Sequence, residues 1–320
     1  MKSALLAAFV ILLPGPWLWA EDANFPRLTL DELRTKYADD NSRFLVIDGV
    51  TVHYKDEGVG PAILMVHGSR STLKTWDHVA AVLSSRYRVI RFDVPPHGLS
   101  GPVSDQAAQD LQPTDIPEQL LATLGVKRIT YVGVSSGGTL GVYLAAKRPD
   151  LVSRLILSNT PSDPVDTSHL VLSDDFLEAQ RVARETGFES PQFWNLFLDY
   201  FSGDPNRIGN GIRTQYYDFN RRISEKNDRA LVGTVQNHEK ATAAMSQVVA
   251  PTLLIWGAQD RLLVPAAAHT LAGYLTNAQV SLMFMPDVGH YPPLETPVRF
   301  GRLIDAYIQA AVITSDATTD

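Results

Sequence analysis

Residues 129–140, ITYVGVSSGGTL, constrain the fold of this chain more than any other stretch. Residues 129–134 are mostly β-branched or aromatic, which is typical of a buried strand, and small residues that can start a helix follow them. The sequence Gly-Val-Ser-Ser-Gly stands between the two. A sharp strand-to-helix turn needs nearly bare positions two before and two after its central residue, and Gly133 and Gly137 meet that need. The pattern predicts that the hydroxyl of Ser135 is exposed at the end of a sheet, facing the positive end of the next helix.

Strands and helices alternate on both sides of this turn. The predicted strands span residues 44–47, 51–54, 62–66, 87–92, 129–134, 151–157, 251–256 and 280–285. The predicted helices span residues 30–37, 76–83, 118–124, 138–147, 266–275 and 297–312. The Asp48-Gly49 pair is a hairpin signal between the first two strands. This rhythm predicts an α/β fold, with a doubly wound, mostly parallel sheet and helices on both faces.

The alternation lapses between residues 161 and 249, where helices are expected over residues 175–185 and 191–201. Aromatic residues recur there at helical spacing, namely Phe193, Trp194, Phe197, Tyr200 and Phe201. They can dock the insertion on the sheet, wall an apolar pocket over Ser135, or do both. We therefore expect a helical cap over residues 161–249, inserted after the sixth strand. The core would then comprise residues 21–160 and 250–313, followed by a frayed tail at 314–320.

The first 20 residues have the layout of a secretory signal peptide. Lys2 precedes an apolar run, a Pro-Gly-Pro breaker follows that run, and Ala20 stands before two acidic residues. Leu18 is larger than usual for its place before the cleavage site. The sequence predicts export to the periplasm or the medium. The alternative is a membrane anchor at residues 4–20.

Composition excludes several kinds of chemistry. The net charge is −7 and there is no basic run, which excludes nucleic acid as a partner. The chain has no cysteine, so it has no disulfide and no thiol nucleophile. No histidine or acidic pair has metal-ligand spacing. We therefore expect a small-molecule substrate, no metal and no cofactor.

A serine hydroxyl needs a base, and the base needs a carboxylate to orient it. Asp260 follows the strand PTLLIW, and His290 follows the strand VSLMFM. Both therefore stand at the carboxyl ends of strands, in the chain order Ser, Asp, His. Asp163 is the rival acid, and Asp287 is interpreted as a loop residue.

An oxyanion hole needs two backbone N–H groups. Ser136, directly after Ser135, should supply one. The loop after the strand at residues 62–66 reads His-Gly-Ser-Arg, and Ser69 is the candidate for the second, with Arg70 as the alternative. The side chain of Arg70 can instead reach a substrate carboxylate or lie at the surface. Arg70, Trp194 and Phe197 are the candidate substrate-pocket residues.

These motifs together resemble the α/β-hydrolase superfamily, in its capped, single-domain branch. The resemblance spans residues 44–312 and rests on the Ser135 turn, His67-Gly68 followed by Trp76, residues 91–100, residues 256–260 and residues 289–291. Residues 91–100 resemble the pattern D-x-x-G-x-G-x-S, but Pro96 stands in place of the first glycine. The resemblance implies the α/β-hydrolase fold and a Ser135–His290–Asp260 catalytic triad.

The serine at the turn separates this chain from the superfamily's epoxide hydrolases and haloalkane dehalogenases, which carry aspartate there. The resemblance implies a serine hydrolase of a small ester, lactone or related acyl compound. A carbon–carbon bond hydrolase of ring-cleavage products is the alternative. Its carboxylate-bearing substrates would need a cation, for which the candidates are Arg70, Arg213, Arg221 and Arg222. A binding protein with slow or no turnover is the alternative from another class.

Overall fold

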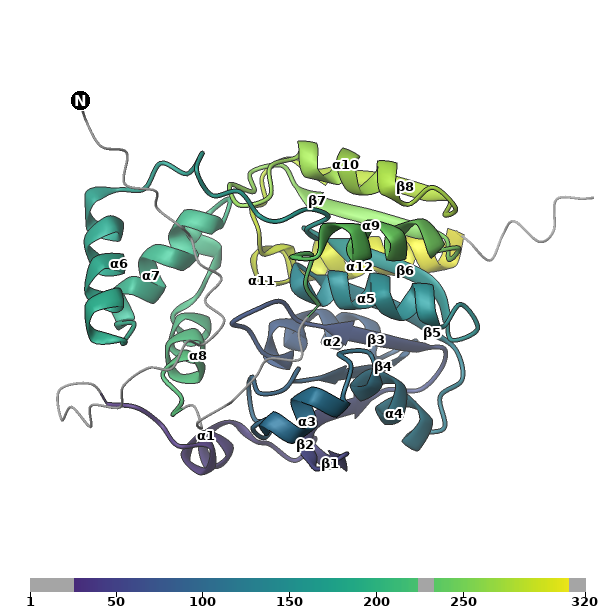
Figure 1. Ribbon diagram of the computed structural model, residues 1–320, viewed down its shortest axis with the longest axis horizontal. Helices are drawn as coiled ribbons and strands as arrows, with labels where there is room; N and C mark the ends of the chain where they lie inside the picture. Colours follow the sequence, from purple (N-terminus) through teal and green to yellow (C-terminus); the bar gives the residue numbers. More distant parts are fainter. Residues whose placement is uncertain (1–25, 224–232, 311–320) are drawn as a thin grey trace, which may run out of the picture.

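The computed structural model describes residues 26–223 and 233–310 (Figure 1). The predicted signal peptide, residues 1–20, and the predicted tail, residues 314–320, lie outside these ranges. Among the described residues, no helix has the length and apolar character needed to span a membrane.

One eight-stranded sheet forms the centre of the molecule, with the strand order β1-β2-β4-β3-β5-β6-β7-β8. The strands are β1 (Arg43–Ile47), β2 (Val50–Glu57), β3 (Ala62–Val66), β4 (Arg88–Phe92), β5 (Ile129–Val134), β6 (Val152–Ser158), β7 (Thr252–Gly257) and β8 (Val280–Met285). The pairs β1–β2 and β2–β4 are antiparallel and the other pairs are parallel. The predicted fold class is therefore confirmed. The hairpin turn at Asp48-Gly49 is also confirmed, with φ of 46° and 82°.

Helices cover both faces of the sheet. One face packs on the 3₁₀ helix η1 (Leu73–Trp76), α2 (Asp77–Leu83) and α12 (Pro297–Ala310), which contribute the buried side chains of Trp76, Leu83, Phe300 and Ile304. The other face packs on α4 (Asp115–Thr123), α5 (Ser136–Lys147), α9 (His238–Gln247) and α10 (Ala266–Tyr274). Strands β5 and β7 are buried along their whole length because helices cover both faces of the sheet.

Between β6 and β7 the chain forms a separate helical layer beside the sheet (Figure 1). We call this layer the insertion; it comprises α6 (Asp174–Thr186), α7 (Pro191–Phe201), η2 (Pro205–Arg207) and α8 (Asn210–Asn220). Ser173 and Ser190 cap α6 and α7 with their side chains, and Pro191 opens α7. The aromatic stripe at residues 193–201 forms a core for the insertion.

Helix α9 does not belong to this layer, although it falls within the range 161–249 that the sequence assigns to the cap. It packs against α5 and α10, and its buried Ala241 and Met245 join the main core of the sheet. The sequence gives no strand between residues 161 and 249 to separate the two helical layers, so the boundary could not be seen there. Helices α1 (Leu30–Tyr37), α3 (Asp105–Asp110) and α11 (Pro292–Glu295) complete the elements.

A buried carboxylate at the end of β4 ties several loops together. Asp93 accepts hydrogen bonds from the backbone N–H of Leu73 at 2.7 Å and of Leu99 at 2.8 Å. It also accepts one from Nδ1 of His53 at 2.7 Å, and Nε2 of His53 lies 2.9 Å from Oγ of Ser42. Burial alone would raise the pKa of Asp93, but the neighbouring His53 imidazole holds this pKa below its ordinary value.

Pro96 lies in the turn after β4. The Pro95–Pro96 peptide is cis, and Gly98 is left-handed with φ 59°. A Cβ on Gly98 would overlap the carboxyl group of Asp93. Glycine is required here because the chain must be left-handed and pass against that carboxylate.

We predict that Asp93→Asn lowers the free energy of unfolding by about 3 kcal/mol at pH 7, because a buried charged acceptor is lost. Urea unfolding measures this. The pKa of Asp93 is lower in the folded than in the unfolded protein. Its stabilisation is therefore present above the ordinary carboxyl pKa of about 3.9 and is lost as the pH falls through the lowered value. The difference between the two proteins should shrink in that acid range.

The matched control for this measurement is Asp110→Asn, at an exposed position at the end of α3. It should change the free energy of unfolding by less than about 0.5 kcal/mol. An Asp93→Asn protein as stable as this control would contradict the proposed role of the buried carboxylate.

Candidate active site

Ser135 lies in the strained turn that the sequence predicts. It is the N-cap of α5, with φ 53° and ψ −129°, and it is partly exposed. Its backbone N–H donates to the carbonyl of Ser158 at 3.0 Å, so the turn is tied to the neighbouring strand β6. A Cβ on Gly133 would lie 2.5 Å from the carbonyl oxygen of Gly137. The turn can therefore form only if Gly133 and Gly137 carry no side chain.

The loop after β3 passes directly against Ser135. A Cβ on Gly68 would lie 2.9 Å from Cβ of Ser135. Within this loop, Oγ of Ser69 donates to Oγ of Ser136 at 2.9 Å. In the described part of the chain, the backbone N–H groups of Ser69 and Ser136 donate to no other residue. Two free N–H donors thus stand on either side of the Ser135 turn.

His67, in the same loop, has a structural role. The backbone N–H of Val94 donates to its Nε2 at 2.9 Å, so the ring proton is on Nδ1, which faces the carbonyl of Gly68 at 2.7 Å. Burial lowers the pKa of His67, and burial together with the nearby His67 lowers the pKa of His97 to about 3. Both rings are therefore neutral at physiological pH.

Asp260 and His290 are brought together by the loops after β7 and β8. Oδ2 of Asp260 lies 2.7 Å from Nδ1 of His290, and both residues are buried. Oδ1 of Asp260 accepts the backbone N–H groups of Leu262 at 2.8 Å and Leu263 at 3.0 Å. A carboxylate can only accept, so Nδ1 of His290 is the donor and Nε2 is the free basic nitrogen.

Across residues 26–223 and 233–310, no hydrogen bond joins Oγ of Ser135 to the ring of His290. Such bonds are often long in the absence of substrate and tighten when it binds. In the same described ranges, no three histidine, aspartate or glutamate side chains are grouped as metal ligands.

Asn159 is a residue that the sequence analysis missed. It follows β6 at the same edge of the sheet, is fully buried, and has the left-handed φ of 45°. Its Nδ2 donates to Oδ2 of Asp260 at 2.7 Å, and its Oδ1 accepts from Oγ of Ser158 at 2.9 Å. Asn159 thus holds the same carboxylate oxygen that faces His290. A polar residue directly after a buried strand was the available signal.

Glu295 was also missed. Its Oε1 accepts the N–H of Gly289 at 2.9 Å, and its Oε2 accepts the N–H of Gly203 at 2.9 Å. Burial raises the pKa of Glu295 despite these bonds. The N–H of His290 donates to the carbonyl of Phe201 at 2.8 Å. The end of α7 and the His290 loop are therefore joined by backbone contacts that no local motif indicates.

The two other candidate acids lie elsewhere. Asp163 accepts from the hydroxyl of Tyr274 at 3.1 Å and lies 3.3 Å from Nδ1 of His238. Asp287 pairs with Arg207 and Arg299, each at 2.7 Å, and these contacts lower its pKa. The place beside His290 that the rival acid Asp163 would fill is taken by Asp260.

The candidate pocket residues Arg70, Trp194 and Phe197 pack against one another where the loop after β3 contacts the insertion. Trp194 is fully buried, and the ring of Phe197 lies 5.2 Å from it, centroid to centroid. Arg70 lies against the Trp194 ring and forms an ion pair with Glu189. These contacts are packing contacts, and their role as pocket walls stays a prediction.

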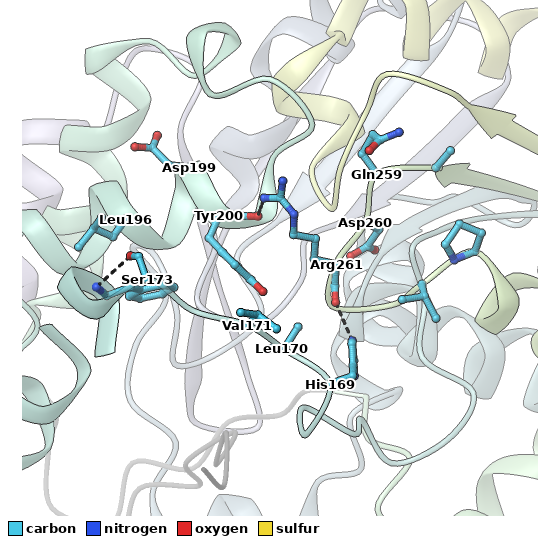
Figure 2. Close-up of a pocket in the computed structure, with 14 residues that line it drawn as sticks. His169, Leu170, Val171, Ser173, Leu196, Asp199, Tyr200, Gln259, Asp260 and Arg261 are labelled. Atoms are coloured by element: carbon cyan, nitrogen blue, oxygen red, sulfur yellow. Dashed lines mark hydrogen bonds between the residues drawn. The ribbon is translucent and has the colours of Figure 1, made fainter. Parts of the chain in front are cut away.

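A cavity of about 800 Å³ lies beside the loop that carries Asp260, which we call the acid loop (Figure 2). It is lined by the linker at residues 169–173, by Leu196 and Tyr200 of α7, and by the acid loop from Ala258 to Arg261. Arg261 donates to the carbonyl of Tyr200, and His169 contacts the carbonyl of Arg261 (Figure 2). The cavity reaches Asp260 but is not lined by Ser135 or His290.

Comparison with known proteins identifies the family of this chain. Residues 61–297 match the family described as alpha/beta hydrolase fold. The pimeloyl-[acyl-carrier protein] methyl ester esterase of Nitrosomonas europaea is 27% identical over 80% of this chain and 99% of that protein. The 2-hydroxy-6-oxononadienedioate/2-hydroxy-6-oxononatrienedioate hydrolase of Cupriavidus pinatubonensis is 25% identical over 82% of this chain and 93% of that protein.

Among solved structures, the enol-lactonase from Burkholderia xenovorans LB400 is similar in fold, with a TM-score of 0.63. It is 21% identical, over 83% of this chain and 100% of that chain. The relatives share a fold and are named as hydrolases of different substrates. The chain belongs to the α/β-hydrolase fold family, and it is a hydrolase by the names of its relatives.

Proposed function

We propose that this protein is a serine hydrolase that cleaves a small, uncharged carboxylic ester or lactone. The observation that carries the proposal is the bond between Asp260 and His290 at the sheet edge where Ser135 stands in a strained, partly exposed turn. The N–H groups of Ser136 and Ser69 flank that turn. Family membership supports a hydrolase but does not by itself choose the substrate.

In the proposed reaction, Nε2 of His290 takes the proton of the Ser135 hydroxyl as Oγ attacks the carbonyl carbon. The carbonyl oxygen becomes an oxyanion, held by the N–H groups of Ser136 and Ser69. His290 then gives its proton to the leaving alcohol, and an acyl-enzyme remains. Water, deprotonated by His290, attacks the acyl carbon, and His290 returns this proton to Oγ of Ser135 as the acid leaves. Asp260 fixes the tautomer of His290 and stabilises its cation throughout.

The preference for an uncharged substrate follows from the pairing of the candidate cations. Arg70 pairs with Glu189, Arg213 with Asp199 at 2.6 Å, and Arg221 with Asp218 at 2.7 Å. Arg222 donates to the carbonyl of Ser100 at 2.8 Å. A substrate carboxylate would have to displace one of these partners, which leaves a carboxylate or a carbonyl group without its donor.

The carbon–carbon hydrolase is the second candidate, and the named activity of the Cupriavidus relative favours it. It uses the same three residues but needs a cation for the carboxylates of its substrate. The paired arginines therefore favour the ester or lactone over this candidate.

We predict that a fluorophosphonate probe labels the wild-type protein and labels neither Ser135→Ala nor His290→Ala, because only an activated serine reacts. Gel fluorescence and peptide mass spectrometry measure this. Ser42 is an internal control, because its Oγ also contacts a histidine, and it should stay unlabelled. A folded wild-type protein without label at Ser135 would reject the hydrolase mechanism and favour the binding protein.

We predict that Asn159→Gly lowers kcat by about 10- to 100-fold, since a hydrogen bond to a charged group is worth about 1.5–3 kcal/mol. Glycine keeps the left-handed backbone, so the loss reports the missing amide rather than strain. Hydrolysis of p-nitrophenyl acetate measures it. Asp163→Asn is the control and should match the wild type. A large loss for Asp163→Asn with none for Asn159→Gly would reverse the assignment.

We predict that p-nitrophenyl 4-methylpentanoate is cleaved with a kcat/KM about 10-fold or more above that of p-nitrophenyl hemisuccinate, which has a carboxylate in place of the branched end. Glu189→Gln should lower the ratio of these two kcat/KM values, because it removes the carboxylate partner of Arg70 and leaves its charge free for the carboxylate of the hemisuccinate. A wild-type preference for the hemisuccinate, or rapid cleavage of a carboxylate-bearing vinylogous diketone, would favour the carbon–carbon hydrolase instead.

A further inference from the structure

Arg70 has a backbone conformation that its residue type does not favour. It follows Ser69 in the loop after β3, and its φ is 61°. The other described non-glycine residues with positive φ are Asp48, Ser135 and Asn159. Aspartate and asparagine tolerate this region, and Ser135 is the turn residue. An arginine with φ in this range persists only where its surroundings hold it there.

The contacts that hold Arg70 come from the insertion. The carbonyl of Arg70 accepts Nδ2 of Asn220, at the end of α8, at 2.9 Å. Its Nη2 donates to Glu189, in the loop between α6 and α7. Its guanidinium carbon lies 4.8 Å from the ring centroid of Trp194, in α7. Backbone and side chain are thus tied to three separate parts of the insertion.

These contacts between Arg70 and the insertion are partly buried. The Glu189 side chain is 21% exposed and that of Arg70 is 42% exposed, while Trp194 is fully buried beneath the guanidinium. A guanidinium that stacks on an indole and pairs with a carboxylate is fixed in direction as well as in charge. Next in the loop, Oγ of Ser71 lies 3.2 Å from the hydroxyl of Tyr216 in α8, which extends the same contact.

The position of Arg70 connects this contact to the proposed chemistry. Ser69, one residue earlier, carries the candidate oxyanion N–H, and Gly68 lies against Ser135. A change of φ at Arg70 rotates the peptide that joins it to Ser69 and shifts the loop that carries the donor. An oxyanion donor acts only when it is held in place before the reaction.

We propose that Arg70 is a positioning residue through which the insertion holds the Ser69 N–H in the oxyanion hole. This rests on the proposed function of Ser135. In this role Arg70 does not touch the substrate. The insertion binds the side chain and the carbonyl of Arg70 and thereby stabilises its left-handed backbone. The loop then keeps the N–H of Ser69 directed at the oxygen of the reacting carbonyl.

The test compares Arg70→Ala with Arg70→Gly on p-nitrophenyl acetate. Both variants remove the side chain, but alanine disfavours a positive φ and glycine does not. We expect Arg70→Ala to lower kcat by about 10- to 100-fold, at most the loss of one oxyanion donor, with KM changed less than about threefold. Arg70→Gly should recover most of that kcat. Equal losses in the two variants, or a loss confined to KM, would overturn the proposal in favour of a substrate contact.

A second measurement does not depend on activity. Amide hydrogen exchange of the peptide spanning residues 67–73 should become faster in Arg70→Ala and in Glu189→Gln than in the wild type. Unchanged exchange in both variants overturns the proposal, whatever the turnover. Failure of the proposed function looks different, because the wild-type protein would then be unlabelled by fluorophosphonate while the exchange difference persists.

Discussion

The close approach of three backbone segments around Ser135 is the constraint on which the rest of the site depends. Strand β5, the start of α5 and the loop after β3 meet there with no room for a Cβ at Gly133, Gly137 or Gly68. This contact turns the chain left-handed at Ser135 and brings the N–H groups of Ser69 and Ser136 to the same point. A methyl group at any of these glycines would move the nucleophile and the donors together.

The proposed acid and base, Asp260 and His290, are positioned by loops that come from different strands. Asp260 accepts donors from its own loop, from Asn159 after β6 and from His290 after β8. Parallel strands end at one edge of a sheet. Asn159 and His290 are more than a hundred positions apart in the sequence, and for this reason both can contact the carboxylate of Asp260. The insertion is joined to the same assembly through Glu295 at the His290 loop, through Arg261 at the Asp260 loop and through Arg70 at the loop after β3.

Local patterns carry enough information to predict the sheet, the Ser135 turn and the pairing of Asp260 with His290. Each of these depends on a strand and the few residues that follow it. Asn159, Glu295 and Arg70 could not be assigned in this way, because their partners are distant in sequence and lie on other elements. Asn159 and Glu295 were missed altogether, and Arg70 was considered as an alternative oxyanion donor and as a cation, but not as a residue that positions the loop. The C-terminal boundary of the helical insertion could not be located from the sequence for a related reason. The sequence shows that α9 is a helix-forming stretch on the way to β7, but not which layer its apolar side buries.

Ser42, His53 and Asp93, which belong to strands β1, β2 and β4 or directly flank them, repeat the hydrogen bonding of a hydrolytic triad in the same sheet. Oγ of Ser42 lies 2.9 Å from Nε2 of His53, whose Nδ1 lies 2.7 Å from Asp93, itself held by two backbone N–H groups. Oγ of Ser42 already accepts the N–H of Asp39 at 3.1 Å and lies 3.5 Å from the carboxylate of that residue. Beside Ser42 lies the carboxylate of Asp39, which is paired with Lys55, whereas the start of helix α5 at Ser136 would attract negative charge that developed beside Ser135. A search by Ser-His-Asp hydrogen bonds alone would therefore return the Ser42 set in this chain, and it is the helix start beside Ser135 that marks the other set as the candidate for catalysis.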